Sequence, residues 1–405
     1  MSRSKSAAGA VLSRDRGGRS GGRLDPASRL PGEWESALAQ IGERSFRARQ
    51  VFRWIHAHGV YDAQLMTNLP NSLREHLANE GLKPPASVAQ VHGSRDGTRK
   101  LVLQLDDAAR VECVLMRSSE SEEDPEEAGG VNDPLARTTE DGRARRVTLC
   151  VSTQVGCAMG CRFCASGQAG LIRGLHAAEI VGQVVLARRC LRPGEQLRNL
   201  VFMGMGEPLQ HYESTARALR LIQHATGLAI GPRRITVSTV GLVPGIRRLG
   251  EDFGGRIGLA VSLHAPDDAT RNRLVPINAR FPIAELLGAL QQYPLPRRRR
   301  ITIEYTLVKG VNDSLSQARA LARLLRRLPV KINLIPMNAV EGSRLRAPSF
   351  ADTDAFREVL VDAGYSCFLR VRRGGDVAAA CGQLALAGRL PLRSRVFGTS
   401  GETSA

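Results

Sequence analysis

Aromatic residues, long apolar runs and acidic residues are all scarce in this 405-residue chain. Aromatic side chains make up 4% of it, which disfavours a nucleic-acid platform of stacked bases. No apolar run is long enough for a membrane span, and the start lacks a secretory signal pattern, so we expect a cytoplasmic protein with no membrane association. The eight cysteines are then reduced thiols rather than the disulfide framework of a secreted protein.

Positive charge is what the chain has in excess. It carries 57 Lys and Arg against 39 Asp and Glu, a formal net charge of +18. Such an excess predicts a polyanionic partner, with nucleic acid first and an anionic membrane surface second. Clustered arginines in the second half of the chain could contact phosphates: Arg233 and Arg234, Arg247 and Arg248, Arg297 to Arg300, Arg326 and Arg327, and Arg372 and Arg373.

Composition and periodicity divide the chain into six parts. We expect a disordered basic tail (1–32), an N-terminal helical domain (33–88), a β extension (89–116), an acidic flexible insertion (117–143), a core barrel (144–386) and a C-terminal tail (387–405). The Arg- and Ser-rich start has the composition of an organelle transit peptide as well, but we interpret it as a disordered tail.

Strand-like and helical runs alternate from Val147 to about Leu386. The strand-like runs are VTLCVST, NLVFMGMG, RRITVST, IGLAVSLH, RITIEYTLV, VKINLIPM and SCFLRVR. This alternation is typical of βα units around a parallel sheet, and about six repeats fit a partial (β/α)6 TIM-type barrel. The chemistry of such barrels gathers at the C-terminal ends of the strands. The polar motifs of this sequence lie at those positions.

Three cysteines stand within eight residues in the segment QVGCAMGCRFCASG, at Cys157, Cys161 and Cys164. Structural zinc needs four ligands, and a fourth is missing here. His176, twelve residues on, is better explained as the start of a helix. Three cysteines spaced CxxxCxxC fit three corners of a [4Fe-4S] cube, which leaves one iron open for a further ligand.

CxxxCxxC ahead of a βα barrel strongly resembles the radical S-adenosylmethionine (SAM) superfamily. The resemblance implies that SAM chelates the open iron and is cleaved to a 5′-deoxyadenosyl radical. The segment MGMGEP, from Met203 to Pro208, follows the second barrel strand. It resembles the superfamily motif for the methionine amino group, and a carboxylate there can accept charge-assisted hydrogen bonds from an ammonium.

The order of several further segments is more specific. VTLCVSTQVGCAMGCRFCASG, MGMGEP, RRITVSTVGLVPGI, VSLHAPDDATRNRLVPIN, ITIEYTLVKGVND, KINLIPMN and AAACGQL closely resemble the RNA adenosine methyltransferases of the RlmN/Cfr family. FRARQVFRWIHAHG and MTNLPNSLREHL resemble the N-terminal helical domain of that family. The resemblance implies methylation of an adenosine ring carbon, most simply C2, in 23S rRNA, with tRNA as a second candidate substrate, at the cost of two SAM molecules.

The resemblance also implies the catalytic residues. Cys381 would take a methyl group from SAM and carry it to adenine, which needs a thiolate. Glu112, in RVECVLM, would remove the ring proton. Cys150 would then attack the Cys381 sulfur and release the RNA, leaving a transient disulfide that a reductant such as flavodoxin reopens. For either cysteine alone, a buried packing role is the simpler interpretation.

Cofactor contacts carry over by the same resemblance to Gly206, Glu207, Ser238, Ser262, Leu263, His264 and Asn338. His264 could instead be a hydrogen-bonded histidine at a strand end, and Glu112 an exposed strand residue. Cys113, Cys190 and Cys367 match no motif, and we expect them to pack in the fold. We expect the protein to act as a monomer.

Alternatives remain open at this point. The methyl group could go to C8 of the same adenosine, or the chain could be a divergent radical SAM enzyme with a protein or another RNA as substrate. A non-catalytic RNA-binding module held by zinc is a third possibility, which a colourless anaerobic protein would indicate.

Overall fold

The structure is a computed structural model that describes residues 19–20, 23–117, 145–370 and 372–384. The acidic insertion, apart from Arg117, and the C-terminal tail of the sequence analysis lie outside these residues. Ordered packing begins ahead of the domain boundary expected at residue 33. Two short strands pair, β1 (Arg19–Ser20) with β2 (Arg23–Leu24). Ala27 and Ser28 are buried in the 3-10 helix Pro26–Ser28 that follows.

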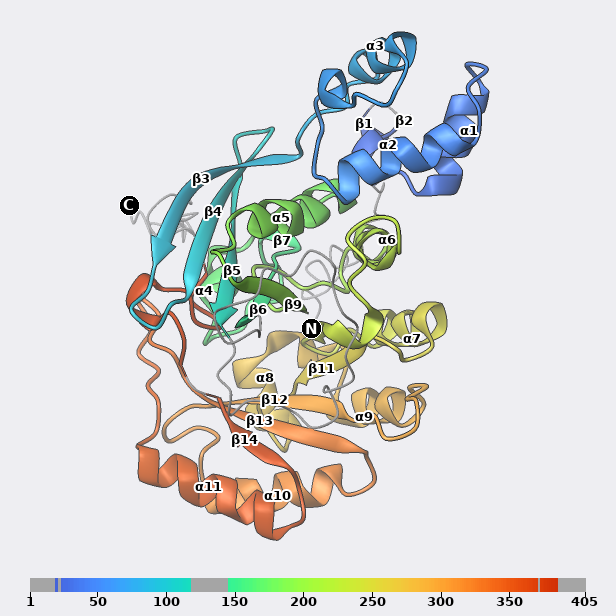
Figure 1. Ribbon diagram of the computed structural model, residues 1–405. Coiled ribbons are helices and arrows are strands. Elements are labelled where there is room, and N and C mark those ends of the chain that lie inside the picture. Colours follow the sequence, from blue (N-terminus) through green and yellow to red (C-terminus); the bar gives the residue numbers. More distant parts are fainter. Residues whose placement is uncertain (1–18, 21–22, 118–144, 371, 385–405) are drawn as a thin grey trace, which may run out of the picture.

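Three helices form the N-terminal domain, as expected (Figure 1). They are α1 (Pro31–Ala39), α2 (Phe46–His56) and α3 (Asn71–Asn79), with the 3-10 helix Ala63–Leu65 before α3. Helix α2 buries Val51, Phe52 and Ile55, so its apolar residues form one face at helical spacing. The exposed side of α2 carries arginines, among them Arg49 and Arg53.

The β extension is an antiparallel meander. Its strands are β3 (Ala86–Gly93), β4 (Arg99–Leu105) and β5 (Arg110–Arg117). Strand β5 pairs antiparallel with the first barrel strand, so the meander continues the barrel sheet. The sequence predicted a β extension at 89–116. Its hairpin turns lie at residues 94–98 and 106–109.

The core is a curved sheet of seven parallel strands among the described residues. They are β6 (Arg145–Cys150), β9 (Glu195–Phe202), β10 (Ile235–Thr239), β11 (Gly258–Ser262), β12 (Ile301–Leu307), β13 (Val330–Pro336) and β14 (Cys367–Leu369). Their spatial order follows the chain. All seven residues of β12 are buried, as expected for a strand covered on both faces. The predicted partial TIM-type barrel is confirmed, with the short β14 as an added edge strand.

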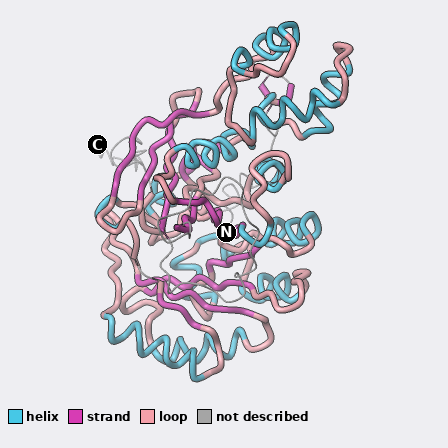
Figure 2. Tube along the Cα trace, viewed as in Figure 1, coloured by secondary structure: helices cyan, strands magenta, loops and turns pink. Residues whose placement is uncertain are grey.

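Helices cover the outer face of this sheet (Figure 2). They are α5 (Ala177–Arg189), α6 (Tyr212–Gln223), α7 (Val243–Phe253), α9 (Ile283–Gln291), α10 (Leu315–Leu325) and α11 (Phe350–Asp362). The short helix α8 (Asp268–Leu274) lies instead at the strand ends, where its Arg271 donates to Val240 O and Leu263 O. Between β6 and α5 lie the short helix α4 (Ala165–Ala169) and the antiparallel pair β7 (Gln154–Gly156) and β8 (Leu171–Gly174). Further 3-10 turns span Pro232–Arg234, Pro276–Ala279 and Gly375–Val377.

The N-terminal domain packs on the barrel through α5 and α6. Arg217 of α6 donates to the Glu33 carboxylate at 2.7 Å, and the Ala178 N–H donates to Ser28 Oγ at 3.0 Å. The ring of Phe52 lies 4.8 Å from that of His224. In the described part of the chain, none of the helices is both long and apolar enough to span a bilayer.

Candidate active site

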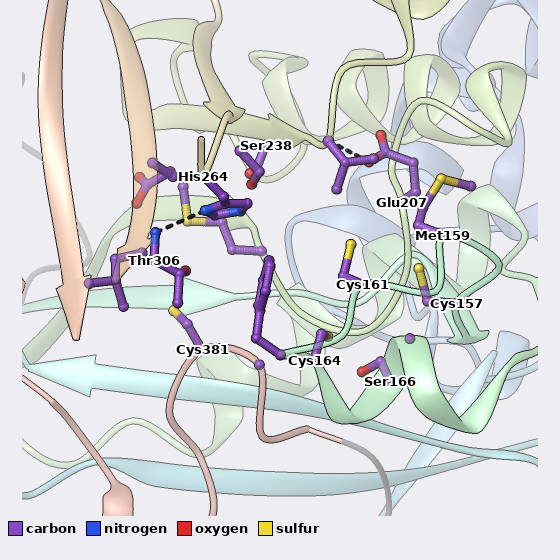
Figure 3. A pocket seen from close by; sticks show the side chains of 18 of the residues that line it. Cys157, Met159, Cys161, Cys164, Ser166, Glu207, Ser238, His264, Thr306 and Cys381 are labelled. Carbon is purple, nitrogen blue, oxygen red and sulfur yellow. Dashed lines mark hydrogen bonds between the residues drawn. The ribbon is translucent and has the colours of Figure 1, made fainter. Parts of the chain in front are cut away.

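A pocket of about 970 Å³, partly open to solvent, lies at the C-terminal ends of the barrel strands. Most of the residues predicted for the site line it (Figure 3). They are Cys157, Cys161, Cys164, Gly206, Glu207, Ser238, Ser262, His264, Asn338 and Cys381. Because parallel strands end at one rim of a barrel, residues as far apart in sequence as Cys157 and Cys381 converge here.

The three-cysteine loop begins at β7 and ends at α4. The Cys157 N–H donates to Gly170 O at 2.9 Å, and Arg162 N–H donates to Leu274 O at 3.0 Å, which ties the loop to α8. Cys164 is the N-cap residue of α4. Gly156 has φ +79°, and a Cβ there would lie 1.9 Å from Gly170 O. Only glycine fits at the start of this loop.

The three thiols suit a cluster better than a single ion. Burial raises the pKa of Cys157 to about 12 and raises the pKa values of Cys161 and Cys164, so metal binding would have to displace their protons. A cube takes each cysteine at a different iron. His176 is the N-cap residue of α5, as expected.

Glu207 lies buried between the ends of β9 and β10. Its Oε1 accepts the Leu209 N–H at 3.0 Å and its Oε2 accepts the Val240 N–H at 2.9 Å. Burial raises the pKa of Glu207 to about 7, against the lowering effect of these hydrogen bonds. Glu207 therefore connects two strand ends in addition to lining the pocket. At Gly206, φ is +105° and a Cβ would lie 2.6 Å from Gln154 Cβ.

His264 is both a hydrogen-bonded strand-end residue and a pocket residue. Its Nδ1 accepts the Thr306 N–H at 2.9 Å (Figure 3), so the neutral ring carries its proton on Nε2. Burial, and to a smaller extent the nearby Arg271, lower the pKa of His264 to about 3. The Phe163 ring meets it edge-on at 4.6 Å. The neutral imidazole can therefore donate one hydrogen bond from Nε2.

Ser238, Ser262 and Asn338 offer neutral hydrogen-bonding groups to the pocket. Leu263, predicted beside them, is 1% exposed and is not among the lining residues. Its side chain alternates to the other face of the strand end, because neighbouring residues of a strand point to opposite sides. Leu263 contributes its backbone carbonyl, which accepts from Arg271 Nε at 2.9 Å.

Arg271 joins the strand ends at the pocket rim by hydrogen bonds, a role that the sequence did not predict. It is fully buried and donates to Leu263 O, Val240 O at 2.6 Å and Ser262 O at 3.2 Å, and to Asn278 Oδ1 at 2.6 Å. Burial lowers its pKa to about 10, so it stays charged at neutral pH. The motif RNRLVPIN contained this residue, but nothing in its local pattern indicates burial.

Cys381 and Cys150 are close enough to interact electrostatically but differ in exposure. Cys381 is exposed and lines the pocket, whereas Cys150, at the end of β6, is 6% exposed and is not among the lining residues. Burial, and then the nearby Cys381, raise the pKa of Cys150 to about 12. All eight cysteines are free thiols here. Cys113 is buried, and Cys190 and Cys367 are half-buried, consistent with packing.

Glu112 is buried, not an exposed strand residue. It is 2% exposed, and its Oε1 lies 3.0 Å from Lys100 Nζ. Val114 pairs directly with Cys150 across β5 and β6. Residues two apart in a strand share a face, so Glu112 and Cys150 lie on the same side of the sheet. Glu112 is not among the residues that line the pocket itself.

Several pocket residues escaped sequence reasoning. Met159, Met203, Glu304, Thr306 and Arg370 line the pocket as well. Arg370 NH1 lies 3.6 Å from Glu304 Oε1, and Asn333 donates to the same oxygen at 3.0 Å. Glu304 and Thr306 lie on β12, whose run ITIEYTL mixes polar and apolar residues. For Glu304 and Thr306, the one sequence signal that could have identified them is a polar residue within an otherwise apolar strand run.

Comparison with known proteins agrees with this geometry. Residues 151–322 match the description "Radical SAM superfamily", and residues 33–81 match "Ribosomal RNA large subunit methyltransferase N-terminal domain". A crystal structure of a radical SAM methyltransferase from Sphaerobacter thermophilus superposes with a TM-score of 0.78 at 42% identity, covering 89% of this chain and 99% of that one. The fold and the three-cysteine pocket are those of a radical SAM enzyme.

Relatives that are similar over nearly their whole length identify the family within this class. The dual-specificity RNA methyltransferase RlmN of Sorangium cellulosum is 59% identical over 384 residues, 93% of this chain and 99% of that protein. The corresponding enzyme of Marinobacter nauticus is 44% identical over 367 residues, 89% of this chain and 92% of that protein. The chain belongs to the RlmN family of RNA methyltransferases.

Proposed function

We propose that the chain is a radical SAM methyltransferase that adds a methyl group to C2 of an adenosine in 23S rRNA, and to an adenosine of tRNA. The relatives are named dual-specificity RNA methyltransferases. The observation that carries the proposal is one pocket holding a three-cysteine loop together with Cys381, which comes from the far end of the chain.

The [4Fe-4S] cluster and SAM supply the methyl group and the radical chemistry when they are bound. Cys157, Cys161 and Cys164 would hold the cluster. Gly206, Glu207, Ser238, Ser262, His264 and Asn338 would orient SAM. The neutral imidazole of His264 and the hydroxyl and amide groups around it are suited to ribose and carboxylate groups.

Cys381 acts as the methyl carrier. Its sulfur loses a proton to solvent and forms a bond to the methyl carbon as the sulfonium bond breaks. The radical chemistry that the bound cofactors supply would remove one hydrogen from this methyl group. Once the carbon has bonded to adenine, Cys150 would lose its proton and attack the Cys381 sulfur. An S–S bond then forms as the S–C bond to RNA breaks, and the released carbon keeps the electron pair of that bond and takes up a proton to become the methyl group. The resulting disulfide must be reduced in each turnover, and we propose a protein reductant such as flavodoxin.

Glu112 acts as the base that takes the proton from the methylated ring carbon. Its burial and its position on the same sheet face as Cys150 support this role. Lys100 Nζ lies 3.0 Å from its carboxylate, so an ion pair fixes the position of this side chain.

The charge distribution supports an RNA substrate. Side chains of Arg247, Arg297, Arg298, Arg326 and Arg372 are exposed, and such residues release counterions when they bind phosphates. Because adenine must leave its stack to reach a buried pocket, a loop or single-stranded site is the favoured target. We propose that the protein works as a monomer in the cytoplasm.

The test is anaerobic reconstitution with iron, sulfide and SAM, followed by mass spectrometry of digested rRNA and tRNA. We expect monomethyladenosine with the methyl group on C2; methyl on C8 would contradict the assigned position. Cys381→Ala should abolish methylation, and Cys150→Ala should accumulate a covalent RNA adduct. Cys367→Ala, at a half-buried cysteine outside the pocket, is the matched control and should retain activity.

A further inference from the structure

The segment that carries Cys381 is held at both ends by parts of the chain distant in sequence. It spans residues 372–384, with little regular structure beyond the 3-10 turn Gly375–Val377. A segment of this kind has many conformations of similar free energy, and ordering each residue costs conformational entropy. Specific contacts are therefore needed to keep the Cys381 sulfur in the pocket.

One end is held by the hairpin turn between β3 and β4. The Gly374 N–H donates to Asp96 Oδ2 at 2.8 Å. In the other direction, Asp376 Oδ1 accepts from Ser94 Oγ at 2.5 Å and Asp376 Oδ2 accepts from Arg95 N–H at 3.2 Å. The two aspartates form reciprocal hydrogen bonds, each from its own loop to the other, across about 280 residues of sequence.

Packing and charge make this contact tight. Gly374 has φ +61°, and a Cβ there would lie 2.9 Å from Thr98 Cγ2, so only glycine permits the approach. Asp96 Oδ1 is itself fixed by the Thr98 N–H at 2.9 Å. Burial raises the pKa of Asp96, but hydrogen bonds from Gly374 and Thr98 outweigh it and lower the pKa to about 2. Asp96 is thus ionised and oriented.

The other end is held at the pocket. Asn338 Nδ2 donates to Cys381 O at 3.0 Å, and the Ala165 N–H donates to Gly382 O at 2.8 Å. Ser166 Oγ donates to Leu384 O. Ala165 directly follows Cys164, so these bonds place the backbone of Cys381 against the three-cysteine loop, as its position near Cys164 in Figure 3 shows.

We propose that the turn Ser94–Thr98 is a clamp that sets the position of the Cys381 sulfur, with Asp96 and Asp376 as positioning residues for methyl transfer. The inference rests on the proposed role of Cys381 as methyl carrier. Methyl transfer requires the Cys381 sulfur about 3–3.5 Å from the methyl carbon, opposite the bond that breaks, and a misplacement of about 1 Å can cost about a hundredfold in rate. The pocket-side bonds fix the backbone at Cys381, and the clamp prevents the preceding residues from pulling it away.

Asp96→Ala and Asp376→Ala test the clamp, since both side chains are exposed and their loss should leave the core folded. The matched control is Asp106→Ala, at the opposite end of β4, where the carboxylate forms an exposed ion pair with Lys83 at 2.7 Å. Three quantities are measured: hydrogen exchange of residues 372–384, SAM affinity, and the single-turnover rate of Cys381 methylation read from the tryptic peptide.

In both clamp variants we expect faster exchange in 372–384 and methylation slowed by about tenfold or more, with SAM affinity within about twofold. Asp106→Ala should match the unchanged protein in hydrogen exchange, SAM affinity and methylation rate. Methylation at the unchanged rate in both clamp variants would overturn the clamp. A loss of SAM affinity as large as the loss of methylation rate would overturn it as well, because it indicates a general structural defect. If the unchanged protein never methylates Cys381, the proposed function fails instead, and the exchange data still report whether the turn holds the segment.

Discussion

Replacing Arg271 by Met should destabilise the fold and loosen the pocket rim together. The guanidinium makes four hydrogen bonds, three of them to backbone carbonyls at the ends of β10 and β11. Each hydrogen bond to a charged group contributes roughly 1.5–3 kcal/mol, but removing the buried charge also removes its desolvation cost. We therefore expect a net loss of about 3 kcal/mol in the free energy of unfolding.

The assay is urea unfolding of the protein without cofactors, alongside SAM binding to the reconstituted enzyme. The control is Arg220→Met, because Arg220 forms an ion pair with Asp252 at 2.9 Å with both side chains partly exposed, worth less than about 1 kcal/mol. Arg271→Met should also weaken SAM binding, since Ser238 and Ser262 lie on the strand ends that Arg271 joins. Loss of an exposed ion pair changes the free energy of unfolding by about 1 kcal/mol at most. If the free energies of both variants stay within about 1 kcal/mol of that of the unchanged protein, this reasoning is refuted.

Three further predictions follow from buried groups. Gly206→Ala should weaken SAM binding in a titration, because a Cβ would lie 2.6 Å from Gln154 Cβ, and unaltered affinity would contradict the tight approach. Lys100→Met should cost about 3 kcal/mol in urea unfolding by removing the cation paired with the buried Glu112 carboxylate, and adding Glu112→Gln should recover most of the loss. Burial lowers the pKa of His56 to about 3 from 6.5, so the folded state favours the neutral ring: its stability contribution is present above pH 6.5 and is lost as pH falls, by about 2 kcal/mol between pH 7 and pH 5. His56→Phe should flatten that dependence, and an equally steep curve would exclude His56 as its source.

Local sequence patterns were enough to predict the barrel and most of its pocket. Alternating strand-like and helical runs indicate parallel βα units, and such units end at one rim, so Ser238, Ser262 and Asn338 were expected to meet. The CxxxCxxC spacing indicated the cluster loop because each iron of a cube takes one cysteine. The side chain of Leu263 does not line the pocket, because a motif of three consecutive residues does not show which of them turns away; its predicted contact with the cofactor stays a prediction.

Contacts made across long sequence separations could not be predicted in this way. The Lys100 to Glu112 pair depends on the register of β4 against β5, which periodicity leaves open. The hydrogen bond from Gly374 to Asp96 joins residues 278 apart, and no local sequence signal marks either partner. Burial of Arg271 runs against the usual exposure of arginine, and only its four acceptors, brought together by the fold, explain it.

The most direct test of the account follows the methyl carbon. The reconstituted enzyme is first methylated on Cys381 with isotopically labelled SAM, freed of excess cofactor, and then given RNA with unlabelled SAM for a single turnover. Mass spectrometry of the RNA digest should find the label on the ring carbon of adenosine, because Cys381 carries the methyl group. A product methyl without label would show that it came straight from the second SAM and would contradict the central role of Cys381.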